Sequence, residues 1–342
     1  MEKRFFGKTK QGQHAWLYTF QNAKGMTMSV TDLGATLQSA TVPGKQGAVD
    51  VILGYDDPAG YEGPSMTYIG STVGRYANRI AGAAFTLNGK TYTMPQCDGR
   101  NNLHSGPDSY AFRIWDVKEV TENSITFFLH SPDGDQGFPG ALDISTTYTL
   151  TEDGIRIDFY GVADQDTLIN PTHHSAFNLN GHDSGSVCNH LLWVDADRYV
   201  AIDAACIPTG KLESVDNTPM DFRTTKEVGQ DVDADHICVK QTQGYDHSWC
   251  LNNQGAFAKT AALQGNVSGI TMEVYTDLPG LQIFSCNDIV NEPGKGGAVY
   301  QPRCGICLEP QYYPDSIHNP HFPQCVFKAG EPYQKAILYR FV

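Results

Sequence analysis

The chain has little positive charge. Its 342 residues hold 24 Lys and Arg against 38 Asp and Glu, which gives a formal net charge of −14 at pH 7. Binding to nucleic acid depends on clustered basic side chains that neutralise phosphates, and an anionic membrane surface attracts the same side chains. No basic block occurs in the sequence. We therefore expect neither nucleic acid nor a membrane as a partner.

Long apolar runs are also lacking. No segment approaches the roughly 20 apolar residues that a membrane-spanning helix needs, and the first six residues, Met-Glu-Lys-Arg-Phe-Phe, do not begin a secretory signal. The nine cysteines are an odd number scattered over a long chain, which is typical of free thiols in a reducing compartment. These features predict a cytoplasmic location.

Two of the cysteines stand in the pattern Cys-Gly-Ile-Cys at 304–307. Such a pair can serve redox chemistry or bind zinc. There is no second pair of this kind, and the surrounding residues are typical of a strand. We favour the interpretation that both are buried, small apolar residues.

Motifs for nucleotide, acyl-transfer and metal chemistry are missing. The sequence has no phosphate-binding Gly-rich loop, no Gly-x-Ser-x-Gly and no His-Glu-x-x-His. His318 and His321 are separated by a proline, so they do not form a helical ligand pair. The run Asp-Gly-Asp-Gln-Gly at 133–137 resembles part of a calcium loop but lacks the later ligands, and a turn is the better interpretation. No metal site is predicted.

Helical periodicity is scarce as well, whereas strand and turn signals are dense. Asn88-Gly89 and Glu152-Asp153-Gly154 predict two hairpins, and the 34 Gly and 18 Pro lie mainly between strand candidates. Short helical turns are possible at 56–62 and 224–231. The pattern predicts an all-β fold, an antiparallel sandwich or barrel with few short helices, in a single domain over 1–342. The expected strands include 84–94, 142–150, 155–162, 124–129, 191–194, 270–275, 281–285 and 336–342.

What the chain does have is a set of polar clusters. Glu309 lies between an apolar run and a proline-broken aromatic segment, where a charge is costly unless it has a partner or a function. His173 and His174 are adjacent, so in a strand only one of them can face a given cavity. A histidine can exchange a proton near pH 7, although His104 and His174, each considered alone, fit a structural role better. The clusters together suit a carbohydrate, with polar groups for hydroxyls and aromatic rings for the apolar face of a sugar.

At this point the residues resemble a known family, the aldose 1-epimerases or galactose mutarotases. No single motif carries the resemblance, but the order and spacing of several motifs over nearly the whole chain are specific. These are Asp-Leu-Gly-Ala-Thr at 32–36, Val-Ile-Leu-Gly at 51–54, Gly-Arg-Tyr-Ala-Asn-Arg-Ile at 74–80, Ser-Pro-Asp-Gly-Asp-Gln-Gly-Phe-Pro-Gly at 131–140, Asp-Phe-Arg at 221–223, Gly-Tyr-Asp-His at 244–247 and Leu308-Glu309.

The resemblance implies a large antiparallel β-sandwich, the galactose mutarotase-like supersandwich. It also implies an enzyme that interconverts the α and β anomers of free hexoses such as galactose and glucose without a cofactor. It implies that Glu309 is the general base and His174 the general acid. The groups that hold the sugar hydroxyls would be Asn78, Arg79, His104, Asp246 and Gln282. Arg75 is interpreted as structural. The partner is then a small hexose, and the sequence leaves the oligomeric state open.

The chain departs from the family pattern at several positions. His173 stands where the family suggests asparagine, Ala176 where it suggests an aromatic residue, and Cys286-Asn287-Asp288 where it suggests Gly-Asn-Phe. These departures spare the two proton-transfer groups but could alter the sugar pocket. Three alternatives follow: a non-catalytic sugar-binding or regulatory protein, an epimerase for another sugar such as a phosphorylated one, and, less favoured, a glycoside hydrolase, which needs a carboxyl pair.

Overall fold

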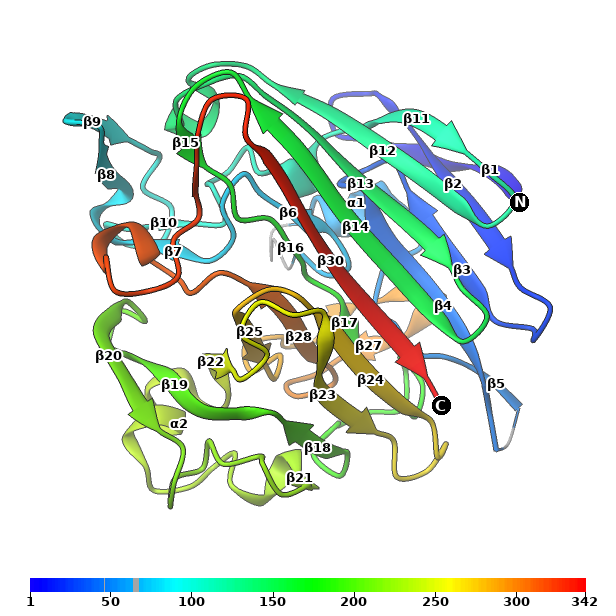
Figure 1. Cartoon of the computed structure of the whole chain (residues 1–342). Helices are drawn as coiled ribbons and strands as arrows, with labels where there is room; N and C mark the ends of the chain where they lie inside the picture. The colour runs from blue at the N-terminus through cyan, green and yellow to red at the C-terminus, as the bar shows by residue number, and fades with distance from the viewer. Residues whose placement is uncertain (46, 64–67) are drawn as a thin grey trace.

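A nine-stranded antiparallel sheet is the largest element of the computed structural model, which describes residues 1–45, 47–63 and 68–342. It crosses the molecule in Figure 1, with the red C-terminal strand near its middle. In order across the sheet the strands are β11 (Asp116–Val120), β12 (Ser124–Ser131), β13 (Leu142–Leu150), β14 (Gly154–Ala163), β30 (Pro332–Phe341), β24 (Thr271–Thr276), β23 (Ala258–Gln264), β18 (Leu191–Val194) and β21 (Lys226–Glu227).

Two further sheets pack with it. One has five strands: β1 (Glu2–Lys8), β2 (His14–Gln21), β3 (Thr27–Thr31), β4 (Thr36–Gly44) and β5 (Gly47–Asp50). The other has six, in the order β17 (Ala176–Phe177), β28 (Ile306–Gln311), β25 (Gly280–Phe284), β22 (Asp246–Leu251), β19 (Ala196–Ile202) and β20 (Pro208–Ser214). Short ladders complete the fold: β6 (Thr72–Val73) with β16 (Thr172–His173), β7 (Arg79–Ile80) with β10 (Asn102–Leu103), β8 (Ala84–Leu87) with β9 (Lys90–Thr93), β15 (Thr167–Leu168) with β29 (Val326–Phe327), and β26 (Glu292–Pro293) with β27 (Val299–Tyr300).

The main core lies between the three large sheets. In β14 the side chains of Ile155, Ile157 and Phe159 are buried, whereas the intervening residues are partly or fully exposed, as a strand with one covered face requires. The same cluster contains Val30 of the five-stranded sheet and Leu308 of the six-stranded sheet. The structure is therefore a large antiparallel sandwich, and the predicted fold class is confirmed.

The predicted strands are present, and both predicted hairpins form around their turns, in β8–β9 and β13–β14. The two possible helical turns correspond to α1 (Pro58–Tyr61) and to a 3₁₀ turn at Val228–Gln230. A second helix, α2 (Ile237–Thr242), was not predicted, because six residues are too few to show a helical period. Neither α-helix in the described part of the chain is long and apolar enough to cross a membrane.

The position of β30 bears on domain organisation. It pairs with β14 on one side and β24 on the other, so one sheet contains strands from the first and the second half of the chain. This supports the prediction of one domain over 1–342, which we retain as a proposal.

Candidate active site

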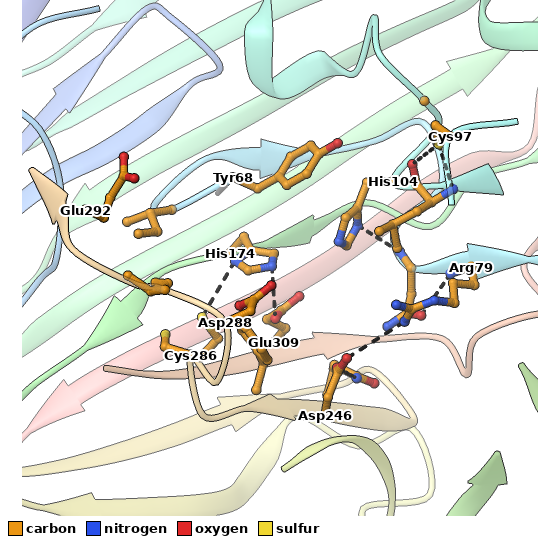
Figure 2. A pocket seen from close by; sticks show the side chains of 18 of the residues that line it. Tyr68, Arg79, Cys97, His104, His174, Asp246, Cys286, Asp288, Glu292 and Glu309 are labelled. Carbon is orange, nitrogen blue, oxygen red and sulfur yellow. Dashed lines mark hydrogen bonds and ion pairs between the residues drawn. The ribbon is translucent and has the colours of Figure 1, made fainter. Parts of the chain in front are cut away.

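A pocket of about 450 Å3 opens beside the six-stranded sheet, within the size range of small-molecule sites. Figure 2 shows polar side chains from several strands and loops turned toward it. All seven site residues predicted from the sequence line this pocket: Asn78, Arg79, His104, His174, Asp246, Gln282 and Glu309. They come from segments that are far apart in the sequence and that the fold brings together.

Glu309 is placed by the alternation of β28. Its neighbour Leu308 points into the main core, so Glu309 faces the opposite side, as does Cys307 two residues before it. Gln282 of β25 is its direct partner in the strand register. Glu309 is only 1% exposed, and its Oε2 atom is buried without a hydrogen-bond partner among the described residues, as is Oε1 of Gln282. Buried polar atoms are normally satisfied, so two adjacent unsatisfied acceptors in a pocket indicate a place for a donor-rich ligand.

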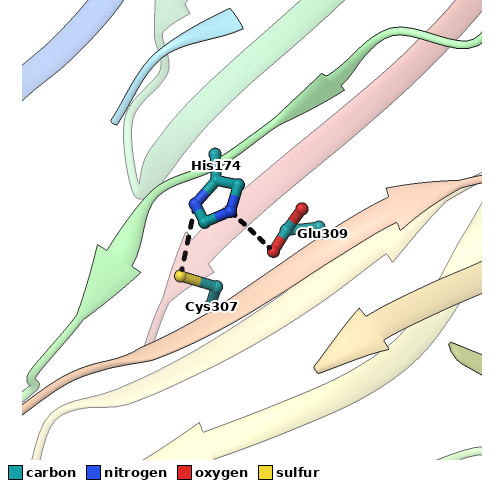
Figure 3. Close-up of side chains that lie close together, drawn as sticks. All are labelled: His174, Cys307 and Glu309. Carbon is teal, nitrogen blue, oxygen red and sulfur yellow. Dashed lines mark hydrogen bonds and ion pairs between the residues drawn. The ribbon is translucent and has the colours of Figure 1, made fainter. Parts of the chain in front are cut away.

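His174 follows β16 directly, and backbone hydrogen bonds with Gly70 and Ser71 fix its position. Its Nε2 lies 3.5 Å from Oε1 of Glu309. On the other side of the ring, Nδ1 lies 3.6 Å from Sγ of Cys307, as Figure 3 shows. One imidazole therefore contacts a carboxyl group and a thiol at once, at the bottom of the pocket.

Burial sets the acid–base properties of this pair. It raises the pKa of Glu309 well above its ordinary value, and the nearby carboxylate of Asp246 raises it further. Burial lowers the pKa of His174 to about 4, against the opposing effects of a backbone hydrogen bond and of Asp246. Both shifts have the same cause, because the charged form of each group loses hydration in the pocket. Glu309 thus becomes a stronger base in its ionised form, and His174 a stronger acid in its protonated form.

Arg79 is held between two carboxylates. Its Nε donates a 2.7 Å hydrogen bond to Oδ2 of Asp98, and its Nη1 lies 3.9 Å from Oδ2 of Asp246. Asp246 also accepts a 2.6 Å hydrogen bond from Nε2 of Gln282. The chain Asp98–Arg79–Asp246–Gln282 fixes donors and acceptors along one wall of the pocket, which is the arrangement that sugar hydroxyls require.

Asn78 and His104 lock each other in place. The backbone N–H of Asn78 donates to Nδ1 of His104 at 3.0 Å, and the N–H of His104 donates to the carbonyl of Asn78. Burial, His174 and Arg79 all lower the pKa of His104 well below its ordinary value. The ring is therefore neutral with Nδ1 as an acceptor, so Nε2 carries the proton and is the donor available to the pocket.

The apolar part of the pocket includes residues that the sequence did not nominate. Tyr68 packs on His104, with ring centroids 4.7 Å apart, and Phe284 lies edge-on to His174 at 6.3 Å. Phe284 could have been found from strand alternation, since it lies two residues after Gln282 on the same face. Asp98 and Tyr68 are in loops without a recognisable motif, so only the folded chain reveals them.

The departures from the family pattern fall into two groups. His173 faces away from the pocket and contacts the hydroxyls of Tyr148 and Ser175, and Ala176 is buried in an apolar cluster. Cys286 and Asp288, in contrast, line the pocket. Asn287, between them, donates to the carbonyls of Thr242 and Tyr245 and so anchors the loop.

A buried carboxyl–imidazole pair surrounded by fixed hydrogen-bonding groups is the kind of site that can move protons on a small polar molecule. Comparison with known proteins identifies the family. The family model described as "Aldose 1-epimerase" matches residues 17–340, and the chain belongs to this family. It is an isomerase that interconverts the anomers of sugars.

Curated relatives and solved structures agree with this assignment. The chain is 37% identical to an aldose 1-epimerase of Escherichia coli K12 over 97% of this chain and 96% of that protein. It is 36% identical to a galactose mutarotase of Bos taurus, covering 92% and 91% of the two chains. The crystal structure of an aldose epimerase homologue from C. elegans superposes with a TM-score of 0.88 at 28% identity, covering 96% of this chain and 99% of that one. A galactose 1-epimerase from Lactobacillus acidophilus gives 0.86 at 25%, covering 100% and 98%.

Proposed function

We propose that this chain interconverts the α and β anomers of free hexoses, galactose and glucose in particular, with Glu309 as the general base and His174 as the general acid. The observation that carries the proposal is the pair itself: two buried acid–base groups 3.5 Å apart, in a pocket that also leaves Oε2 of Glu309 and Oε1 of Gln282 without partners in the described chain. Names of relatives that mention galactose support the choice of hexose.

Ring opening needs one proton removed and one supplied. The Glu309 carboxylate takes the proton of the C1 hydroxyl while the His174 imidazolium protonates the ring oxygen, and the C1–O bond breaks to give the open-chain aldehyde. Rotation about C1–C2 presents the other face of the carbonyl, and the two groups reverse their roles on closure. The substrate gains and loses one proton, and no cofactor enters the balance.

Burial of the Glu309–His174 pair affects the energy of these proton transfers. Ring opening starts from the ionised form of the pair and leaves both groups neutral. Burial favours the neutral forms at rest as well, because it raises the pKa of Glu309 and lowers that of His174, so the ionised form is the less populated arrangement of the same single proton. The energy needed to form the buried ion pair is recovered when ring opening discharges it.

The remaining predicted residues bind and orient the sugar. His104 and Arg79 line the pocket and carry N–H donors, and Asp246 offers carboxylate acceptors to hydroxyl groups. Asn78 and Gln282 complete the set with amide groups. Phe284 and Tyr68 supply aromatic surface for the apolar face of the ring.

The charge of the pocket favours a neutral sugar over a phosphorylated one. Among the described lining residues, Arg79 is the one Arg or Lys side chain, and it already contacts two carboxylates. Asp246, Asp288, Glu292 and Glu309 place four carboxyl groups around the same space. An anionic substrate would be repelled at this range. The nine free thiols support a reducing compartment, and we propose the cytoplasm as the location.

The test is polarimetry on freshly dissolved α-D-galactose and α-D-glucose with the wild type and Glu309→Gln side by side. We expect fast relaxation with the wild type and a loss of about 10²-fold to 10⁴-fold in kcat for the variant. An unchanged circular-dichroism spectrum serves as the folding control. A wild type no faster than buffer would favour the sugar-binding alternative, and a fully active variant would remove Glu309 from the role of base.

A further inference from the structure

The pocket contains a cluster of three potential metal ligands, of which the acid–base mechanism uses two and leaves the third, Cys307, without a role. His174, Cys307 and Glu309 each offer one ligand atom, and these atoms lie within 4.8 Å of one another. In the parts of the chain that the structure describes, no other group of three or more His, Cys, Asp or Glu side chains meets this condition. All three residues line the pocket, so an ion can reach them from solvent.

The thiol–imidazole distance fits a zinc ion. Zinc binds thiolate sulfur at about 2.3 Å and histidine nitrogen at about 2.0–2.1 Å in tetrahedral geometry, which places the two ligand atoms roughly 3.6 Å apart. Sγ of Cys307 lies 3.6 Å from Nδ1 of His174. Figure 3 shows the thiol and the carboxyl group on either side of the one ring. These two atoms are therefore already at the separation that an ion between them requires.

Glu309 supplies a second, independent indication. Its Oε2 atom is buried and has no hydrogen-bond partner among the described residues. A carboxylate can complete a zinc site as a third ligand. Glu309 contacts Nε2, the imidazole nitrogen that Cys307 does not contact, so its carboxyl group reaches an ion held at Nδ1 only after rotation of its side chain. The distances to be closed are short, since one ligand atom from each of the three residues lies within 4.8 Å of the other two. The pocket itself leaves the fourth position open to water.

We propose that His174, Cys307 and Glu309 form an inhibitory site for Zn²⁺ at the bottom of the sugar pocket. The Cys307 thiol releases its proton to water as the zinc–sulfur bond forms, and no electron transfer takes place. Burial, together with the neighbouring Cys286, raises the pKa of the Cys307 thiol, so the charge of the ion must drive its ionisation. Because the ion occupies both proton-transfer groups, it excludes the sugar and acts as a competitive inhibitor.

The chain offers a matched pair of variants. Cys307→Ala removes the thiol that faces His174, whereas Cys304→Ala removes a thiol that is buried in the same apolar cluster but does not line the pocket. Because Cys307 contacts His174, the zinc inhibition of each variant is measured against its own mutarotation rate in metal-free buffer. With Zn²⁺ we expect competitive inhibition of the wild type and of Cys304→Ala, reversed by EDTA. For Cys307→Ala the half-inhibiting concentration should rise about tenfold or more. Mg²⁺, which prefers oxygen ligands, should have no comparable effect.

A measurement independent of activity separates this proposal from the proposed function. Co²⁺ binding should produce a thiolate-to-cobalt charge-transfer absorption in the wild type and in Cys304→Ala but not in Cys307→Ala, even if neither hexose proves to be a substrate. If Cys307→Ala does not fold, alkylation of wild-type thiols followed by mass spectrometry answers the same question, because Zn²⁺ should protect Cys307. Equal Zn²⁺ inhibition of the two variants, or alkylation of Cys307 unaffected by Zn²⁺, would overturn the proposal.

Discussion

His173 and His174 are adjacent in the sequence, yet their side chains serve opposite faces of the structure. Nε2 of His173 lies 2.8 Å from the hydroxyl of Tyr148 in the core, whereas Nε2 of His174 lies 3.5 Å from Oε1 of Glu309 in the pocket. Both rings are buried. Substitution of His174 therefore tests catalysis, and the same substitution of His173 tests stability and serves as its control.

The first prediction concerns His174. His174→Asn should lower kcat on α-D-galactose by about 10²-fold to 10⁴-fold, because the ring oxygen loses its proton donor. His173→Asn, which alters a side chain outside the pocket, should keep kcat within a few-fold. Polarimetric initial rates over a range of sugar concentrations measure both. If His174→Asn changed KM alone, His174 would be a binding group and not the acid.

The second prediction is the pH profile of kcat/KM. The working pair carries one proton in total, so activity is lost when both groups are protonated or both are deprotonated. With the pKa of His174 lowered to about 4 and that of Glu309 raised, the profile should be a broad plateau whose acid limb lies near pH 4. Recovery of full activity on return to pH 7 excludes unfolding as the cause. An acid limb near pH 6.5 would contradict the shift of His174.

The third prediction concerns stability and pH. Burial, and secondarily His174, lowers the pKa of His173 to about 3, so between pH 6.5 and that value the unfolded chain binds a proton that the folded chain does not. Above pH 6.5 neither state binds this proton, and the histidine has no effect on stability. Below pH 6.5 proton uptake by the unfolded chain lowers the free energy of unfolding by about 1.4 kcal/mol for each pH unit of acidification. His173→Asn should flatten the slope by that amount. Urea unfolding at pH 7, 6 and 5 measures it, with exposed His14→Asn as the control. Parallel slopes for wild type and His173→Asn would contradict the prediction.

The fourth prediction addresses Asp98, which was not recognised from the sequence. Asp98→Asn removes the carboxylate that holds Nε of Arg79 and leaves Arg79 free to move toward Asp246. We expect KM to rise about fivefold, equivalent to about 1 kcal/mol, with kcat little changed. Asp166→Asn, which alters a surface carboxylate bound to Lys328, is the matched control. A fall in kcat at constant KM would instead place Arg79 in the stabilisation of the transition state.

Local patterns account for what the sequence could predict. The alternation of apolar and polar residues and the Asn-Gly or Asp-Gly turns are set by residues that are neighbours in the sequence. The hairpins and most strands could therefore be predicted from the sequence. The seven site residues were named through a family resemblance, and the structure brings all of them to one pocket. Their proton-transfer and binding roles remain predictions for the variants above.

The features that could not be predicted from the sequence depend on contacts between distant segments. Asp98 reaches Arg79 only because a loop folds over β7, and Tyr68 meets His104 across separate segments. The shifts in the pKa values of Glu309 and His174 arise from burial, which a sequence does not state. The proximity of Cys307 to His174 likewise results from β28 lying beside the segment after β16, so the cysteine pattern at 304–307 gave no indication of it.

The place of β30 has a consequence for how the molecule is assembled. β30 pairs with β24 on one side and, on the other, with β14, which lies more than a hundred positions earlier in the chain. The central hydrogen bonds of the large sheet therefore connect segments that the ribosome makes at very different times. Before that strand docks, β14 and β24 both present unpaired edges over an apolar face. A folding chain therefore leaves these two edges open until β30 pairs with them. Such a high contact order predicts slow folding and a period of exposure to aggregation, during which chaperones would be most useful.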